Sequence, residues 1–408
     1  MNILLIDQPL WNRGDESAHK GLIRSLIKNV SNVKIKVMEI DVEQAAIDEF
    51  DMQLPQVQFI NIHSLSRTWF MRIFNHAYEY YIGWLLLWIP IGRKIKKMYE
   101  EADVIIMAPG GINLGGFQDW KHLSLLLIAR KMNKKLVYYG RSIGPFYDEN
   151  WKQRRFKELA CKALKYCEFV SLRDEKSVQV AKELNILCVP TVDSAFLDST
   201  EVEIPVGIQQ LIENNPYIVF VPNELRWHYA FQNIEASDIN NFYVRLVDIM
   251  QKYYPKHKIV MLPQTNNQKR NDYDYFCELR EIFQNKENIV VIPDTYSSDI
   301  QQAVVKRAIL MVGARYHSIV FAINQSIPFI SLSYEHKMSG LLEKLGETDR
   351  MIDIVPIFSN SQTMEVAITR FETLLTNLVR PMVAQEKAKI IAKECFDKFV
   401  KVLATVGE

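Results

Sequence analysis

Mostly apolar runs alternate with amphipathic stretches along the first half of the chain. The apolar runs are NILLID (2–7), VKIKVMEI (33–40), DVIIMAP (103–109), KLVYYG (135–140) and EFVSLR (168–173). Apolar runs of this length predict strands that are buried on both faces of a sheet. The stretches between them have helical spacing, as at 16–29, 119–132 and 150–165. This alternation is typical of a parallel sheet covered by helices on both faces.

A second series of the same kind follows a polar linker at about 198–215. Its apolar runs are YIVFVP (217–222), KIVMLP (258–263), NIVVIP (288–293), ILMVG (309–313) and PFISLS (328–333). The predicted fold class is therefore α/β, with two Rossmann-like doubly wound domains facing a cleft. The N-terminal domain is expected over 1–200 and the C-terminal domain over 216–383. Residues 384–408 are expected to form a helix that packs back on the first domain.

An aromatic segment, WFMRIFNHAYEYYIGWLLLWIPI at 69–91, lies within an insertion of the first domain at about 60–100. Charged residues such as Arg72 and Glu79 interrupt it, so its charge-free part is too short to span a bilayer. One interpretation is a helix pair packed on the core or on a second copy of the chain, as in a homo-oligomer. The other is peripheral membrane contact through 69–97, which the basic run GRKIKK at its end favours.

Composition narrows the class of protein. The 408 residues are 48% hydrophobic and 24% charged, as in globular proteins with two or three cores. The net charge of +1 provides no basic field for nucleic acid, so no nucleic-acid partner is expected. The five cysteines form no Cys-x-x-Cys pair, and the N-terminus does not resemble a signal peptide. We expect a cytoplasmic location, with peripheral attachment at the inner face of the plasma membrane as an option.

The most informative motif is GARYHSIVFAINQSIPFISLSYEHK, at 313–337. It places Arg315, His317 and Lys337 after two successive strands, at the sheet edge where open α/β sheets bind ligands. A helix that opens near His317 offers free N–H groups to a phosphate or carboxylate, and histidine is a common proton donor at neutral pH. The alternative is that the two cations are ordinary loop residues and that His317 caps a surface helix.

Two glycine-containing loops follow strands of the first domain. In WNRGDE (11–16), Asn12 and Asp15 are candidate substrate ligands beside Gly14, although Asp15 would also serve as a helix cap. In GGINLGG (110–116), Gly110 and Gly111 are candidates for cradling an anion or a sugar. This loop matches neither the P-loop nor the dinucleotide-binding pattern.

Two arginines also follow strands of the first domain. Arg141 in RSIGPF and Arg173 in RDEKS are candidate ligands for carboxylate or phosphate. Arg173 stands beside Asp174, which fits an internal ion pair equally well. Asp193 in VDSAF either accepts a hydrogen bond from a sugar hydroxyl or caps a turn.

In the second domain, LPQTNN (262–267) brings the amide of Gln264 to a strand end, where it could bind hydroxyls or a base edge. The DYD at 272–274 resembles a metal motif of sugar transferases but fits a helix start better. No other cluster resembles metal ligation, so neither a metal nor a cofactor is expected.

Together, WNRGDE, APGG, GRSIGPF, SLRDEKS, VDSAF and the 313–337 motif resemble the polysaccharide pyruvyl transferase family, over about 10–345. The resemblance implies transfer of the carboxyvinyl group of phosphoenolpyruvate to a glycan or a lipid-linked saccharide, giving a pyruvate ketal and phosphate. It also implies a fold similar to that of the GT-B glycosyltransferases. The Gly-x-Arg-x-His motif makes Arg315 the anion binder and His317 the general acid. Its Tyr-x-x-Lys motif falls on Tyr334 and Lys337.

The chain departs from the family pattern at Arg141, where glutamine is the commoner residue, and in the loop that reads Pro-Gly-Gly-Ile. Two other functions remain open. A GT-B nucleotide-sugar glycosyltransferase would place Arg315 and Lys337 on a pyrophosphate. A non-catalytic glycan-binding protein would keep the fold without the chemistry.

Overall fold

The computed structural model describes all residues except 8–9, 41, 43–46, 49, 51, 53, 63–82, 111–113, 117, 200, 268–269 and 406–408. The chain divides into two compact units. Unit 1 comprises Met1–Leu10, Asp15–Asp198 and Ile390–Glu408, and unit 2 comprises Trp11–Gly14 and Ser199–Lys389. Residues 11–14 therefore belong to the second unit, whereas the sequence led us to place them in the first.

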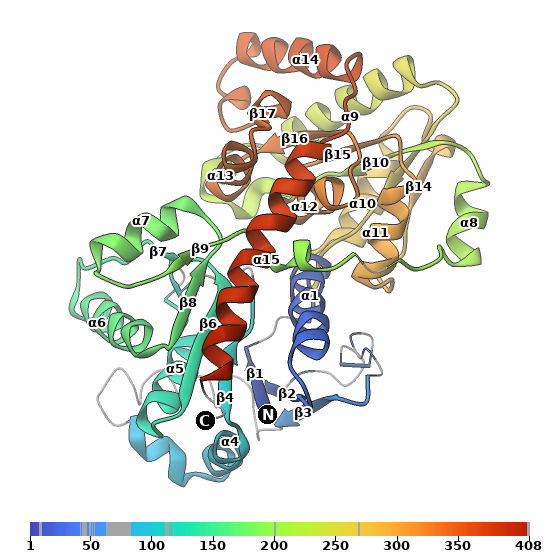
Figure 1. The fold of residues 1–408 in the computed structure, drawn as a ribbon. Helices are drawn as coiled ribbons and strands as arrows, with labels where there is room; N and C mark the ends of the chain where they lie inside the picture. Colours follow the sequence, from blue (N-terminus) through green and yellow to red (C-terminus); the bar gives the residue numbers. More distant parts are fainter. Residues whose placement is uncertain are drawn as a thin grey trace. The chain divides into compact units, whose positions relative to one another are not determined.

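Unit 1 contains a parallel sheet whose described strands run in the order β3-β2-β1-β4-β6-β8-β9 (Figure 1). The strands are β1 (Asn2–Ile6), β2 (Lys34–Ile40), β3 (Val57–Ile62), β4 (Val104–Met107), β6 (Lys135–Arg141), β8 (Phe169–Leu172) and β9 (Val189–Pro190). The helices are α1 (Arg13–Asn29), which begins in residues of unit 2, α4 (Pro90–Glu101), α5 (Trp120–Lys131), α6 (Trp151–Tyr166) and α7 (Glu175–Glu183). Short elements are η1 (Gly83–Trp88), β5 (Leu114–Gly115), β7 (Ile143–Gly144) and η2 (Ser194–Leu197).

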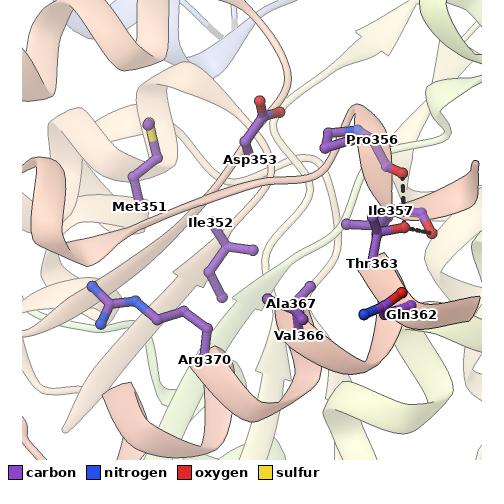
Figure 2. Close-up of a pocket in the computed structure, with 10 residues that line it drawn as sticks. All are labelled: Met351, Ile352, Asp353, Pro356, Ile357, Gln362, Thr363, Val366, Ala367 and Arg370. Atoms are coloured by element: carbon purple, nitrogen blue, oxygen red, sulfur yellow. Dashed lines mark hydrogen bonds between the residues drawn. The ribbon is translucent and has the colours of Figure 1, made fainter.

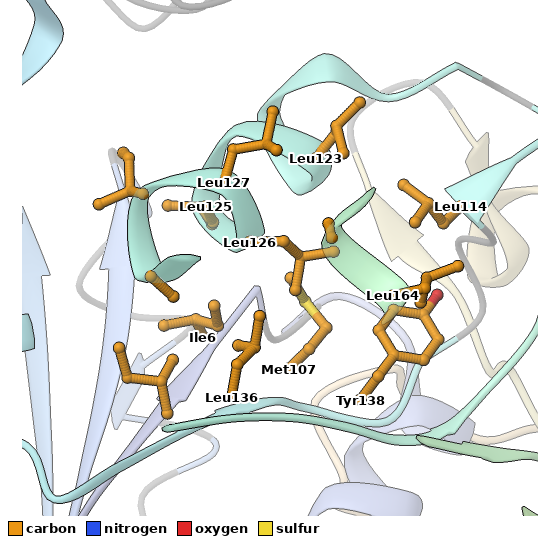
Figure 3. Close-up of a cluster of buried hydrophobic side chains, with 14 of the residues drawn as sticks. Ile6, Met107, Leu114, Leu123, Leu125, Leu126, Leu127, Leu136, Tyr138 and Leu164 are labelled. Atoms are coloured by element: carbon orange, nitrogen blue, oxygen red, sulfur yellow. The ribbon is translucent and has the colours of Figure 1, made fainter. Parts of the chain in front are cut away.

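Both faces of this sheet are buried, which explains its unbroken apolar strands. Leu4 and Ile6 of β1 belong to a core cluster that includes the leucines of α5 (Figure 3). Ile3 and Leu5 point to the opposite cluster, which includes Phe399 of the last helix, α15 (Met382–Ala404). Alternating side chains of one strand thus fill two cores, so a polar residue is excluded from both positions.

Unit 2 has a second parallel sheet, with its described strands in the order β14-β11-β10-β15-β16-β17. They are β10 (Tyr217–Val221), β11 (Lys258–Met261), β14 (Ile289–Val291), β15 (Leu310–Gly313), β16 (Phe329–Ser333) and β17 (Met351–Asp353). The helices of this unit are α8 (Val206–Ile212), α9 (Ala236–Tyr253), α10 (Asp272–Glu281), α11 (Ser298–Lys306), α12 (Tyr316–Asn324), α13 (His336–Leu345) and α14 (Ser361–Leu375). Its short elements are η3 (Leu225–Trp227), η4 (Tyr229–Phe231), β12 (Asn266–Asn267), β13 (Arg270–Asn271), η5 (Lys286–Asn288), η6 (Thr348–Arg350) and η7 (Pro356–Phe358).

The two strand orders have the same consequence for ligand binding. In each sheet the first strand in the chain lies between two parallel neighbours: β1 lies between β2 and β4, and β10 lies between β11 and β15. The chain first adds strands on one side of this first strand and then crosses over to add strands on its other side. Ligands of open α/β sheets bind at the carboxyl ends of the strands at such switch points. The loops after β1, β4, β10 and β15 are therefore the places to look for chemistry.

The predicted α/β class with two Rossmann-like sheets is confirmed. The polar stretch that we interpreted as a linker contains α8, and the sequence did not predict β3, β17 or α14. The aromatic segment at 69–91 lies largely outside the described residues, apart from its end in η1. Across the described part of the chain, no helix combines the length and apolar character needed to cross a membrane.

Candidate active site

The tight turn from β15 into α12 holds Arg315 and His317. β15 ends at Gly313, and Arg315 is the N-cap residue of α12. A Cβ atom at position 313 would lie 2.0 Å from Oγ of Ser318. That same Oγ donates a hydrogen bond to the carbonyl oxygen of Arg315 at 2.5 Å. Gly313 is therefore required for the close return of the helix onto the strand.

The buried carboxylate of Asp272 orients the guanidinium of Arg315. Nη2 of Arg315 donates to Oδ1 of Asp272. Oδ2 of Asp272 accepts from the backbone N–H groups of Gln264 and Thr265, both at 3.0 Å. Burial opposes the charged form of Arg315, but Asp272 outweighs it, so the pKa of Arg315 lies above its ordinary value. The side chain of Arg315 remains 16% exposed, so it is a fixed cation with part of its surface open.

Buried polar groups without partners gather around this ion pair. Gln264 is 1% exposed, yet neither the nitrogen nor the oxygen of its amide has a hydrogen-bond partner among the described residues. Nε of Arg315 and Oγ1 of Thr265 are in the same state. Because an unpaired buried polar group costs about 1–3 kcal/mol, such groups are rare. Their concentration here indicates a place for a polar ligand.

Residues 11–14 complete the surroundings of the Arg315–Asp272 pair. Asn12 forms an antiparallel bridge with Thr265. The backbone N–H of Arg13 donates to the carbonyl oxygen of Gln264 at 2.8 Å, and its Nη2 donates to the carbonyl oxygen of Asp294 at 2.7 Å. Oδ1 of Asn12 accepts from the backbone N–H of Gly14 at 2.8 Å. A segment from near the N-terminus is thus fixed to the strand-end loop after β11.

This segment brings Gly14 directly against the imidazole of His317. A Cβ atom at position 14 would lie 2.0 Å from both Cγ and Nδ1 of His317. His317 itself is buried, at 7% exposure, in the first turn of α12. The position of the imidazole therefore depends on the absence of a side chain at residue 14.

Tyr334 and Lys337 follow the next strand, β16. The hydroxyl of Tyr334 accepts from Nδ2 of Asn223 at 2.7 Å, and Asn223 follows β10. Tyr334 also interacts electrostatically with Arg315. Lys337 is half-buried in the first turn of α13.

Contacts within unit 2 connect five residues predicted from the sequence: Asn12, Gln264, Arg315, His317 and Tyr334. Sequence reasoning missed Arg13, Asp272 and Asn223. Arg13 could have been found, because it is an arginine in a strand-end motif. Asp272 begins α10, as predicted for the DYD sequence, but its contact with Arg315 left no signal in the sequence.

In unit 1, Arg141 is enclosed by groups of its own unit. It is 0% exposed, and its Nη1 donates to Oδ2 of Asp7 at 3.0 Å and lies 3.1 Å from the ring of His122. A bulge at Gly140, whose φ is +60°, precedes Arg141 at the end of β6. Burial would raise the pKa of Asp7, but Lys121 and Arg141 outweigh it and lower that pKa. Arg141 thus has partners within unit 1, and its expected role in substrate binding stays a prediction.

Arg173 and Asp193 form a buried pair with each other. Nη1 of Arg173 donates to Oδ2 of Asp193 at 2.6 Å, and Oδ1 of Asp193 caps η2 through the N–H of Ala195 at 3.0 Å. Asp174 instead accepts from the hydroxyl of Ser142 at 2.6 Å. The structure thus contains the internal ion pair and the cap that were the alternatives to substrate binding, with Asp193 rather than Asp174 as the partner of Arg173.

The remaining predicted ligands of unit 1 are near the ends of β1 and β4. Asp15 is buried in the first turn of α1. Gly110 is buried three residues beyond β4. Gly111 lies outside the described residues. Their predicted role in substrate binding therefore stays a prediction.

Two histidines of unit 1 are buried in their neutral form. Burial, together with the positive charge of nearby Arg141, lowers the pKa of His122 to about 3. Burial likewise lowers the pKa of His19 to about 3, although the carbonyl oxygen of Pro109 accepts from its Nε2. Both rings are therefore neutral acceptors or donors at physiological pH.

A separate pocket of about 400 Å³ lies in unit 2 at β17 and α14 (Figure 2). Its lining is Met351, Ile352, Asp353, Pro356, Ile357, Gln362, Thr363, Val366, Ala367 and Arg370. It contains none of the predicted site residues. Within the described ranges, no three His, Cys, Asp or Glu side chains are grouped so that they could hold a metal ion.

Comparison with known sequences identifies a family and relatives of this chain. A model of the family described as polysaccharide pyruvyl transferase matches residues 45–336, which include Arg315, His317 and Tyr334. The amylovoran biosynthesis protein AmsJ of Erwinia amylovora is 23% identical over 310 residues, which cover 72% of each chain. The similarity predicted from the motifs is confirmed.

Comparison with solved structures addresses the fold. UDP-GlcNAc 2-epimerase from Methanocaldococcus jannaschii has a TM-score of 0.58 at 14% identity, over 97% of this chain and 99% of that one. Arabidopsis thaliana UGT89C1, complexed with UDP, has a TM-score of 0.57 at 10% identity, over 98% of both chains. These similarities show that the chain has the two-domain GT-B fold, as predicted, and they say nothing about its ligand.

We predict that Gly14→Ala destabilises the protein by about 1–3 kcal/mol, because its methyl group overlaps the imidazole of His317. In a His317→Gly background, which removes the overlapping atoms, the same change should cost much less. The measurement is a double-mutant cycle by urea unfolding. Gly340→Ala is the matched control, since no heavy atom lies within 4 Å of a Cβ built there. Equal costs in both backgrounds would contradict the contact.

We also predict that the free energy of unfolding falls between about pH 7 and about pH 5. The folded-state pKa of His122 lies below its unfolded value of 6.5, so the unfolded chain takes up a proton that the folded chain refuses. This stability is present above pH 6.5 and is lost as the pH falls toward 3. His122→Gln should reduce the fall in the free energy of unfolding from pH 7 to pH 5 by about 2 kcal/mol. Exposed His336→Gln serves as control, and an unchanged pH dependence in His122→Gln would refute the assignment.

Proposed function

The chain belongs to the polysaccharide pyruvyl transferase family, and we propose that it transfers the carboxyvinyl group of phosphoenolpyruvate to a sugar of a cell-surface polysaccharide or its lipid-linked precursor. The products would be a cyclic pyruvate ketal and inorganic phosphate. A polysaccharide acceptor is supported by the similarity to AmsJ, an amylovoran biosynthesis protein.

The observation that carries this proposal is the buried, unpaired amide of Gln264 beside the Arg315–Asp272 pair. The two N–H groups of such an amide can donate to a carboxylate or a phosphate. A buried amide whose donors have no partner in the described chain is the expected state of a site that is completed by a ligand. The donor is the natural candidate, because Arg315 supplies positive charge at the same place.

Phosphoenolpyruvate carries a carboxylate and a phosphate on three carbons, so its site must replace the hydration of both anions. Arg315 would bind one of them through the exposed part of its guanidinium, which Asp272 holds in place. The N-terminus of α12 adds a positive dipole end. Lys337, at the start of α13, is the second cation that we assign to the donor.

His317 is the proposed general acid. Its protonated ring would deliver a proton to the methylene carbon of the donor, which leaves positive charge on the adjacent carbon. A sugar hydroxyl then bonds to that carbon and loses its proton, which restores charge balance. The carbon–oxygen bond to phosphate breaks, a second hydroxyl of the sugar attacks the same carbon, and its proton leaves with phosphate. No oxidant, metal or cofactor enters this balance.

Attachment to a membrane surface would bring the enzyme to a lipid-linked acceptor. In α4, Ile95, Met98 and Tyr99 are buried, while the four cations at 93, 94, 96 and 97 are exposed. Trp88, just before this helix, is 71% exposed. A basic helix face next to an exposed indole is typical of proteins bound to anionic lipid. We assign peripheral contact at the cytoplasmic face to this surface; the rest of the predicted contact, 69–82, lies outside the described residues.

We predict that His317→Asn lowers the rate of phosphate release from phosphoenolpyruvate and acceptor by about 100-fold to 10,000-fold, with little change in donor binding. Arg315→Ala should mainly raise the Michaelis constant for phosphoenolpyruvate. His257→Asn and Arg245→Ala, in the same unit, are the controls. Thermal shift with phosphoenolpyruvate and with UDP-sugars identifies the donor, since the true donor should stabilise the fold. Stabilisation by a UDP-sugar alone would refute the proposal in favour of a glycosyltransferase.

We further predict opposite effects of Gln264→Leu on stability and on binding. The change removes two unpaired buried polar groups, so the free energy of unfolding of the apo protein should stay constant or rise by about 1 kcal/mol. It also removes the donors for the substrate, so the dissociation constant of phosphoenolpyruvate should rise about 10-fold. Urea unfolding and calorimetric titration measure the two quantities. A variant that is less stable but binds normally would show that Gln264 has only a structural role.

A further inference from the structure

Aromatic side chains gather next to the candidate active site, after β10 and β16. Trp227, His228 and Tyr229 are consecutive and lie in two short turns, η3 and η4. The rings of His228 and Tyr229 have centroids 4.3 Å apart at an angle of 37°. Tyr229 is 81% exposed, whereas Trp227 and His228 are half-buried. We call these three residues the aromatic platform.

The platform is connected to the proposed donor site through Tyr334 and Asn223. The ring centroid of Tyr334 lies 6.1 Å from that of Trp227 and 5.3 Å from that of His228. Nε1 of Trp227 donates to Oδ1 of Asn223 at 3.3 Å, and Nδ2 of Asn223 donates to the hydroxyl of Tyr334 at 2.7 Å. Because Tyr334 also interacts with Arg315, the platform stands beside the proposed anion site.

The charged residues around the aromatic platform indicate which kind of ring-shaped ligand it could bind. Two half-buried carboxylates, Glu224 and Glu335, flank it, one directly before η3 and the other next to Tyr334. Glu335 acts electrostatically on His228, whose pKa burial nevertheless lowers below its ordinary value, so the ring is neutral. Carboxylates accept hydrogen bonds from hydroxyl groups and repel phosphate. A neutral ligand with many hydroxyls therefore fits better than a nucleotide.

The geometry points to a binding site on the aromatic platform for a pyranose ring of the acceptor glycan. Its apolar C–H face would lie on the ring of Tyr229, whose π face carries partial negative charge. The ring of Trp227, which stands at 89° to that of His228, would contact an edge of the sugar. Hydroxyls at its edge would donate to Glu224 and Glu335. The identification of this ring as part of the acceptor rests on the proposed function. The binding of a pyranose to the platform is independent of the proposed function.

The test uses the full chain with methyl β-galactoside, methyl β-glucoside, methyl α-mannoside and uridine as separate probes in saturation-transfer NMR. We expect transfer to at least one pyranoside, and Tyr229→Ala or Trp227→Phe should weaken its binding about 10-fold or more. Tyr253→Ala is the matched control, because this tyrosine of unit 2 is also exposed, at 40%. Since Tyr229 is mostly exposed, its truncation should leave the fold intact, which the melting temperature will verify.

A thermal shift with phosphoenolpyruvate on the same samples separates the two proposals. Pyranoside binding that depends on Tyr229 supports the platform whether or not phosphoenolpyruvate binds. Stabilisation by phosphoenolpyruvate in wild type and Tyr229→Ala alike, with pyranoside binding unchanged by the substitution, would overturn the platform and leave the proposed function standing. Transfer to uridine in place of every pyranoside would also overturn it.

Discussion

The candidate active site depends on one buried carboxylate. Asp272 accepts hydrogen bonds from two backbone N–H groups of the loop after β11. It also accepts one from the guanidinium of Arg315, which follows β15. It therefore connects two strand ends that are far apart in sequence. An uncompensated buried charge costs about 3–5 kcal/mol, so each partner is needed for the other to remain in place. The same contact leaves part of Arg315 exposed, and that part gives the site its positive charge.

Most strands of the two sheets were predictable from the sequence, because a strand buried on both faces admits few polar residues. NILLID became β1 and ILMVG became β15. The third strand of unit 1, VQFINI, was missed since its partly exposed face makes it less apolar. β17 was missed because three residues are too few to form a pattern.

Residues of the candidate site were predictable only where they belong to a recognisable sequence motif at the end of a strand. The positions of Arg315 and His317 follow from the glycine turn that precedes them, and their neighbours Asn12 and Gln264 follow from other strand ends. The sequence could not distinguish a cation whose side chain stays partly exposed, as that of Arg315 does, from one that is enclosed within its own unit. Arg141 and Arg173 follow strands just as Arg315 does, yet their partners Asp7 and Asp193 are 134 and 20 residues away. Such pairing is a property of the folded chain alone.

The assignment of residues 11–14 to unit 2 limits how this protein can be divided. A fragment that began at Ser199 would contain the whole sheet of the second unit. It would lack residues 11–14, of which Gly14 lies against the imidazole of His317. The second half alone is therefore not a complete unit. In chimeras with related enzymes, exchange of the second half alone would combine residues 11–14 of one protein with the β15–α12 turn of another. The fit between residue 14 and the histidine of that turn would decide whether the hybrid retains its chemistry.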